Sequence, residues 1–355
     1  MSAATIDIGL ARRVAESGCG APIDPELPGG LDGLDAVVDQ ALGRACEYCE
    51  ISRPEREVVV RLVSRRDWVE ANLATIESVG GRIVSRLGGG EAPAAAALAS
   101  GVGDRAFASV AGAQAGIALG FASSRVLGQY RVALLGEAVE PELLLVAQNI
   151  DEVARRLEVD RAELFKWVTL HETAHVLQFE AGGALAERIG GLAGAVLDGS
   201  QPRISLADLV GLTSKLVPPD PRRLARALRD FEPFDLLTDA ETQASFRSLQ
   251  AAMSLLEGHA EHVMDAAAEG FVERVDLLRG ALDQRRASRN LVETLIARLL
   301  GFAAKARQYR EGRVFVEAVV ESAGIGALNR AWLQPEMLPS GYELADPAAW
   351  LRRVS

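Results

Sequence analysis

"LFKWVTLHETAHVLQFEAGG" covers residues 164–183 and contains two of the only four histidines in the chain. His171 and His175 are four positions apart, so on a helix their side chains stand one turn apart on the same face. The apolar residues recur with helical spacing, and Gly182 and Gly183 form a typical helix end. The stretch therefore predicts a helix that presents both imidazoles side by side.

The spacing HExxH is typical of a zinc site. Two imidazoles in this arrangement can bind one zinc ion, while Glu172 can act as general base on a water molecule. Leu164 and Val168 fall on the same line along the helix as His171 and His175, so the histidines continue a stripe that faces the core. Two imidazoles without partners would be costly there. The sequence thus predicts one Zn²⁺ per chain, held by His171 and His175.

A catalytic zinc needs a third protein ligand, and the other two histidines lie in "LEGHAEHVMD", residues 256–265. Glu257 is favoured, because it falls among apolar neighbours on a helix, where a carboxylate requires a partner. Glu261, one turn later, could accept a hydrogen bond from a ligand histidine. His259 is the next alternative as ligand, followed by Glu261 and His262. Either histidine could instead stabilise an oxyanion or lie at the surface.

The remaining sequence predicts a mainly α-helical fold with a small strand element beside the metal helix. "RVALLGEAVEPELLLVAQNI", residues 131–150, reads as a hairpin or a pair of strands. "AFASVAGAQAGIALGFA", residues 106–122, has glycines at four-residue spacing; it is short for a membrane span and favours a buried helix. The predicted organisation is a flexible segment 1–33, one helical domain 34–324 with subdivisions near 88–101 and 217–223, and a tail 325–355 packed on that domain.

Composition narrows the class of protein. The net charge of −11 and the pI near 5.1 argue against nucleic acid as a partner. The first thirty residues lack the apolar core of a signal peptide, and three cysteines are few. These features predict a cytoplasmic protein with no membrane partner.

Several stretches resemble a known family. HExxH followed by a glutamate-bearing second helix is similar to the gluzincin branch of zinc peptidases, in which the third ligand is a glutamate and an acid follows four residues later; Glu257 and Glu261 match that spacing. "SRRDWVEANL", "HETAHVLQFE", "LLEGHAEHVMD" and "NRAWLQPEMLP" further resemble a zincin-like family whose members are labelled as hydrolases or as associated with deazaflavin-coenzyme biosynthesis. The resemblance runs from about Ser64 to the end of the chain and implies a mainly helical zinc-binding fold. By analogy with zincin-like folds, residues 142–150 could form an edge strand that pairs with an extended substrate, with a core strand as the equal alternative.

Together these patterns predict a zinc-dependent hydrolase, with a metallopeptidase favoured, that acts on a peptide or on a small amide or ester. The alternative is a non-catalytic zinc protein in which the metal braces two helices. A di-iron bundle is disfavoured, because "EGHAEH" does not supply its second Glu-x-x-His unit. Further polar candidates for contact with substrate, each with a structural role as the alternative, are Tyr130, Lys305, Gln308 and Tyr309.

Overall fold

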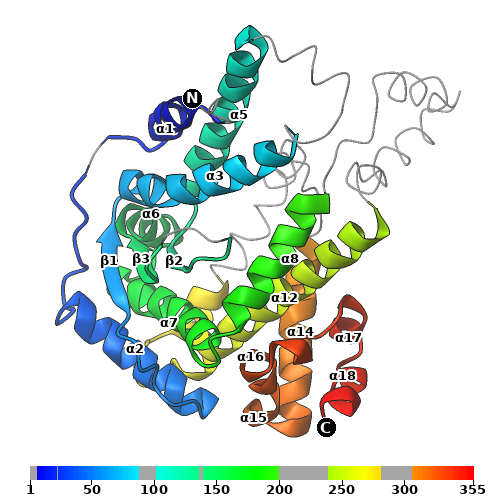
Figure 1. Ribbon diagram of the computed structural model, residues 1–355. Helices are drawn as coiled ribbons and strands as arrows, with labels where there is room; N and C mark the ends of the chain where they lie inside the picture. Colours follow the sequence, from blue (N-terminus) through cyan, green and yellow to red (C-terminus); the bar gives the residue numbers. More distant parts are fainter. Residues whose placement is uncertain (1–5, 22, 88–100, 136–138, 200–238, 281–305) are drawn as a thin grey trace, which may run out of the picture.

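The computed structural model describes residues 6–21, 23–87, 101–135, 139–199, 239–280 and 306–355 (Figure 1). The described part is mainly α-helical with one three-stranded sheet, which confirms the predicted fold class. The predicted linkers near 88–101 and 217–223 lie outside the described residues, apart from Gly101, where a helix begins. The helices are α1 (Ile8–Ser17), α2 (Leu34–Cys49), α3 (Arg65–Leu87), α5 (Gly101–Ser123), α6 (Ala147–Leu157), α7 (Arg161–Glu180), α8 (Leu185–Gly199), α12 (Ala240–Ala266), α14 (Ala306–Ala323), α15 (Ile325–Leu328), α16 (Arg330–Leu333), α17 (Gly341–Ala345) and α18 (Pro347–Val354).

The sheet has the strand order β1–β3–β2, with β1 (Val59–Val63), β2 (Gly128–Arg131) and β3 (Glu142–Val146). β3 pairs in parallel with β1 and antiparallel with β2. All five residues of β3 are buried, and Leu145 packs into one core cluster while Leu144 and Val146 pack into another. Of the two alternatives for residues 142–150, the core strand holds for β3, because it has a partner on each side, and α6 begins at Ala147. β1 and β2 are the edge strands of the sheet.

The HExxH helix, α7, lies at the centre of the molecule. It begins where the Asp160 side chain accepts a hydrogen bond from the backbone N–H of Glu163, and it ends just before Gly182 and Gly183. The sequence suggested one apolar stripe, but α7 is buried on most of its circumference, since α2, α6, α12 and β2 all contact it. A helix covered on several sides provides a rigid support for the two histidines.

The second long helix, α12, lies across α7 and carries Glu257 (Figure 1). It begins at Asp239, whose side chain caps Thr242, and it packs against α8 and α14 as well. Its crossing with α14 is close: a Cβ at Gly258 would lie 2.3 Å from the backbone of Gly312. Gly258, the residue after Glu257, therefore allows α12 to pack closely against α14.

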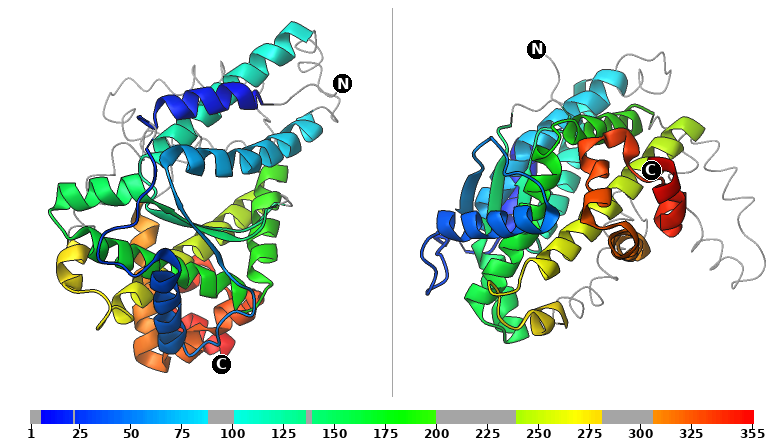
Figure 2. Two further views of the ribbon diagram at one scale, coloured as in Figure 1. Left: turned by 90° about the vertical axis from the view of Figure 1, so that its left-hand side faces the viewer. Right: turned by 90° about the horizontal axis from the view of Figure 1, so that it is seen from below.

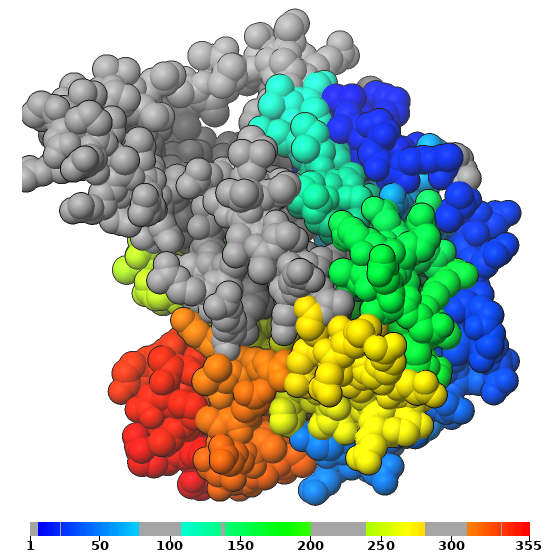
Figure 3. All heavy atoms as spheres, turned by 180° about the vertical axis from the view of Figure 1, so that it is seen from behind, coloured from blue at the N-terminus to red at the C-terminus, as the bar shows by residue number. Residues whose placement is uncertain are grey.

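The C-terminal helices continue this second layer. Seen from behind, α14 lies between the red C-terminal helices and the yellow end of α12 (Figure 3). Phe315, Trp332 and Trp350 are fully buried there, together with Leu255 and Leu256 of α12. The tail thus supports the helix that carries Glu257.

The N-terminal segment differs from the prediction of flexibility over residues 1–33. Within it, α1 lies alongside α5 at the opposite end of the molecule from the C-terminal helices (Figure 2). The contact is made through the spaced glycines of α5: a Cβ at Gly112, Gly116 or Gly120 would lie 2.4, 2.5 or 2.9 Å from a backbone oxygen of α1. Two backbones can approach this closely only where one side has no side chain. Within the described residues, no helix is long and apolar enough to cross a membrane.

We expect Gly116→Ala to destabilise the protein by about 1–3 kcal/mol, because its methyl group would collide with the Ala11 carbonyl of α1. The control is Gly191→Ala in α8, where a Cβ would meet nothing within 4 Å. That change should stabilise the helix by about 0.5–1 kcal/mol. Denaturant unfolding of both variants measures the difference, and equal effects would contradict the role assigned to the glycines.

Candidate metal centre

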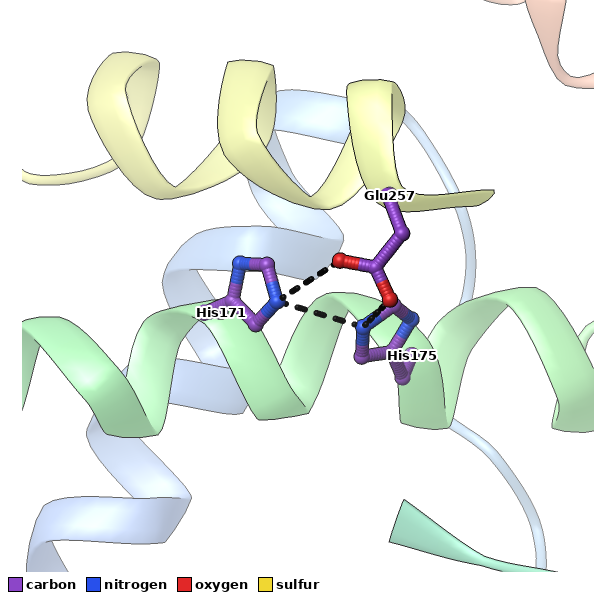
Figure 4. A group of neighbouring side chains, drawn as sticks. All are labelled: His171, His175 and Glu257. Carbon is purple, nitrogen blue, oxygen red and sulfur yellow. Dashed lines mark hydrogen bonds and ion pairs between the residues drawn. The ribbon is translucent and has the colours of Figure 1, made fainter. Parts of the chain in front are cut away.

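Three ligand atoms from two helices converge at the contact between α7 and α12. The Nε2 atoms of His171 and His175 are 3.3 Å apart, and the Glu257 carboxylate lies 3.6 Å from the first and 3.9 Å from the second. Figure 4 shows the imidazoles on α7 pointing toward the carboxylate on α12. Among the described residues this is the one group of three His, Cys, Asp or Glu side chains close enough to hold a metal ion.

The spacing of these atoms fits zinc. With bonds of about 2.0–2.2 Å, two ligands at the corners of a tetrahedron lie about 3.3–3.6 Å apart. The two imidazole Nε2 atoms are separated by that distance. The Glu257 carboxylate lies a few tenths of an ångström farther away, with Oε2 at 3.6 Å from His171 and Oε1 at 3.9 Å from His175. Two imidazoles and one carboxylate are also a donor set that catalytic zinc sites use.

The three ligands face a cleft of about 510 Å³. Their side chains are partly accessible, with 17, 14 and 29% exposed for His171, His175 and Glu257. The cleft is lined by residues of β2 and by apolar residues of α7, α8 and α12, namely Val168, Phe179, Ile189, Met253, Leu256 and Met264. A small molecule or an extended chain can therefore reach the metal position.

Glu172 lies beside the ligands and lines the same cleft, but it is itself buried. The pKa of its carboxyl group is raised to about 7, chiefly by burial and also by the nearby Glu257 carboxylate, against the lowering effects of His175 and the backbone N–H of Tyr130. Gly128 of β2 packs against this side chain, since a Cβ there would lie 2.5 Å from Glu172 Cγ. The strand therefore holds the carboxyl group in place.

The outer edge of β2 runs along the cleft. The Val146 N–H donates to the Leu127 carbonyl, so in an antiparallel pair Gln129 and Arg131 also bond to β3. The backbone groups of Gly128 and Tyr130 then point away from β3. The hydrogen bond from the Tyr130 N–H to Glu172 agrees with this direction.

His259, a ligand candidate from the sequence, lies behind the metal site and is joined to the ligand His175 through Gln178, a residue that the sequence did not single out. His259 is fully buried against Trp332, with ring centroids 4.7 Å apart, and it lies outside the ligand group. Burial lowers its pKa to about 3, with smaller contributions from His262 and His175, so the ring is neutral. Its Nδ1 lies 2.8 Å from Nε2 of Gln178, whose Oε1 is 2.8 Å from Nδ1 of His175. The only indication of Gln178 in the sequence was its position, as a polar residue in an apolar part of the helix three residues after His175.

The other two candidates, His262 and Glu261, lie outside the group of three ligands. His262 Nε2 is 2.5 Å from the Tyr48 hydroxyl of α2, and burial lowers its pKa. Glu261 is buried one turn after Glu257, with its carboxylate 3.9 Å from Arg313 of α14. The hydrogen bond from a ligand histidine that the sequence assigned to Glu261 is made, for His175, by Gln178.

Tyr130 lines the cleft, and its hydroxyl donates to Glu180 at 2.6 Å. Burial and this carboxylate raise the pKa of the phenol. The side chains of Lys305, Gln308 and Tyr309 lie outside the described residues.

Comparison with known proteins places this geometry in a family. The sequence profile of zincin-like metallopeptidases matches residues 6–351, nearly the whole chain. The chain belongs to the zincin-like metallopeptidase family. A solved structure from Chloroflexus aurantiacus, described as "a putative hydrolase with a novel fold", is similar over 98% of both chains, with 26% sequence identity and a TM-score of 0.66. The comparison with curated proteins gave no match. Membership of the zincin-like metallopeptidase family supports a zinc-dependent hydrolase and confirms the resemblance inferred from the sequence.

Proposed function

We propose that the protein is a zinc-dependent metallopeptidase with one zinc ion held by His171, His175 and Glu257. The observation that carries the proposal is the convergence of these three ligand atoms, at zinc spacing, beside a buried glutamate in an open cleft. Glu172 is the general base. The family and the similar hydrolase support a hydrolytic reaction, and the peptide substrate is our own inference.

When bound, zinc supplies Lewis acidity that polarises a carbonyl group and makes a water molecule more acidic. Glu172 accepts the proton of the attacking water on its carboxylate and passes it to the leaving nitrogen. A carboxyl group suits this role when its pKa lies near the working pH, and burial moves the pKa of Glu172 in that direction. The Tyr130 N–H and the Gly128 backbone keep the carboxyl group aimed into the cleft.

The outer edge of β2 is the proposed binding surface for the substrate backbone. An extended peptide can add to such an edge through main-chain hydrogen bonds. Because the Tyr130 N–H bonds to Glu172, the backbone groups available in that direction are the N–H and carbonyl of Gly128 and the carbonyl of Tyr130. The apolar wall formed by Phe179, Met253 and Leu256 then favours a substrate with an apolar side chain close to the scissile bond.

The direct test is hydrolysis by the metal-loaded protein. Incubated with a mixture of peptides and analysed by mass spectrometry, the protein should cleave peptide bonds, lose this activity after dialysis against a zinc chelator, and regain it with one equivalent of Zn²⁺. Stoichiometric zinc without cleavage of any peptide, simple amide or ester would overturn the proposal in favour of a non-catalytic zinc protein.

We also expect Gly128→Ala to lower hydrolysis by about 10- to 100-fold while zinc binding is unchanged, because the new methyl group would displace the Glu172 side chain. Metal content and kcat are measured on the same preparation. Gly191→Ala serves as control, since its added Cβ meets nothing and lies away from the cleft. A Gly128→Ala protein with normal kcat would show that β2 does not position the base.

A further inference from the structure

Gln178 makes three hydrogen bonds at the contact between the two ligand helices. It lies on α7 almost one turn after His175 and is fully buried. Its Oε1 is 2.8 Å from Nδ1 of His175, and its Nε2 is 2.9 Å from the Leu256 carbonyl and 2.8 Å from Nδ1 of His259. One side chain therefore contacts a metal ligand, the backbone immediately before Glu257, and a buried histidine.

The Leu256 carbonyl fixes the direction of every hydrogen bond in this chain. A carbonyl oxygen only accepts, so the amide nitrogen of Gln178 must face Leu256 and the amide oxygen must face His175. His175 then carries its proton on Nδ1, which leaves the Nε2 lone pair directed toward His171 and Glu257. By the same logic, Nδ1 of His259 accepts and the His259 proton lies on Nε2, 3.8 Å from Cys49 Sγ.

We propose that Gln178 is the positioning residue of the metal centre. It holds His175 in the tautomer that can bind a metal, and it ties α7 to α12 at the residue before the third ligand. This inference rests on the proposed metal site formed by His171, His175 and Glu257, but not on the hydrolytic reaction. A positioning partner of this kind raises metal affinity, because the ligand ring needs no reorientation on binding.

An amide fits this position better than a carboxylate. The three neighbours require one acceptor, toward His175, and two donors, toward Leu256 and His259. A carboxylate would satisfy His175 but would place negative charge against a carbonyl oxygen and a lone pair in a buried site. The amide thus meets all three demands without a buried charge.

The first experiment uses the metal-free wild-type protein. Nitrogen-15 spectra of the imidazole rings report the tautomer of each histidine, and with four histidines the signals can be assigned by single substitutions. We expect His175 as the Nδ1–H tautomer and His259 as the Nε2–H tautomer. The opposite tautomer at either ring would overturn the proposal, and the tautomers themselves are read from the wild-type protein.

The second experiment compares Gln178→Met with a matched control, Asn329→Leu. Asn329 is also a buried amide, which donates to the Cys49 carbonyl at 2.6 Å without contacting a ligand of the metal. We expect Gln178→Met to lose the tautomer preference of His175 and to weaken zinc binding by about 10- to 100-fold in competition with a chelator. Asn329→Leu should bind zinc as the wild type does.

Gln178 would have a purely structural role if Gln178→Met kept the wild-type tautomers and zinc affinity. An equal loss of zinc affinity in both variants would lead to the same conclusion. Thermal unfolding of both proteins ensures that affinities are compared between folded chains. Neither readout depends on turnover. If zinc binds and the variants behave as expected while no substrate is cleaved, the proposed function fails and the role of Gln178 stands.

Discussion

Replacing Glu172 with glutamine should leave zinc bound and lower kcat by about 10²–10⁴-fold, which is the usual contribution of a general base. Glutamine keeps the size of the side chain and can still accept a hydrogen bond from the Tyr130 N–H, but it cannot accept a proton from water. Glu172 is not one of the three converging ligands, so the metal content should not change. Zinc analysis and peptide hydrolysis on the same sample measure both expectations.

Glu180→Gln is the matched control for this substitution. Glu180 lies on the same helix and accepts a hydrogen bond from the Tyr130 hydroxyl, which glutamine can also accept. It does not line the cleft, so its substitution should leave kcat close to the wild-type value. Full activity in the Glu172→Gln protein would remove Glu172 as the base, and loss of zinc from that variant would make it a determinant of the metal site instead.

The second large effect concerns the third ligand. We expect Glu257→Ala to weaken zinc binding by more than about 100-fold, because the loss of a direct ligand should exceed the 10- to 100-fold effect of losing an outer hydrogen bond. Two imidazoles would remain on α7, and the attachment of the metal to α12 would be lost. Competition with a chelator gives the dissociation constants.

His262→Asn provides the comparison on the same helix. The His262 ring bonds to the Tyr48 hydroxyl of α2 and lies outside the ligand group, so its loss should leave zinc affinity unchanged. Normal affinity in Glu257→Ala combined with a large loss in His262→Asn or His259→Asn would show that one of these histidines is the third ligand, as the sequence left open.

The helix that carries the two histidines could be predicted from the sequence, because the spacing of residues within one helix determines which of them share a face. Four-residue spacing places His171 and His175 on one helix face whatever surrounds them. Glu257 could be selected because a carboxylate among apolar neighbours needs a partner, and the structure places that carboxylate next to both histidines. The mainly helical fold followed from the same periodicities.

Features that depend on pairing between distant segments could not be obtained in this way. β1 was not anticipated, and it pairs with β3, some 80 residues later in the chain. Analogy with zincin-like folds offered residues 142–150 as an edge strand and their apolar run offered a core strand; the buried β3 is the central strand. The edge strand that lines the cleft is the shorter and less apolar β2.

The role of Gln178 was hidden for a related reason. Its hydrogen bonds join residues 78 and 81 positions apart, and nothing in the spacing of the sequence specifies them. The same holds for the contact of Glu261 with Arg313 of α14, a partner that the sequence spacing does not specify. Motif spacing predicts which side chains share a helix face, whereas the partners of that face depend on how the helices cross.

The position of Glu257 on α12 has a consequence for the time at which the protein acquires its metal during synthesis. The HExxH helix is complete at residue 180, but α12 ends at residue 266 and rests on α14, which ends at residue 323. A growing chain emerges from the ribosome from its N-terminus, so both histidines are exposed long before the glutamate has its supporting helix. The nascent polypeptide therefore carries an incomplete centre until α12 and its supporting helix α14 have both been synthesised.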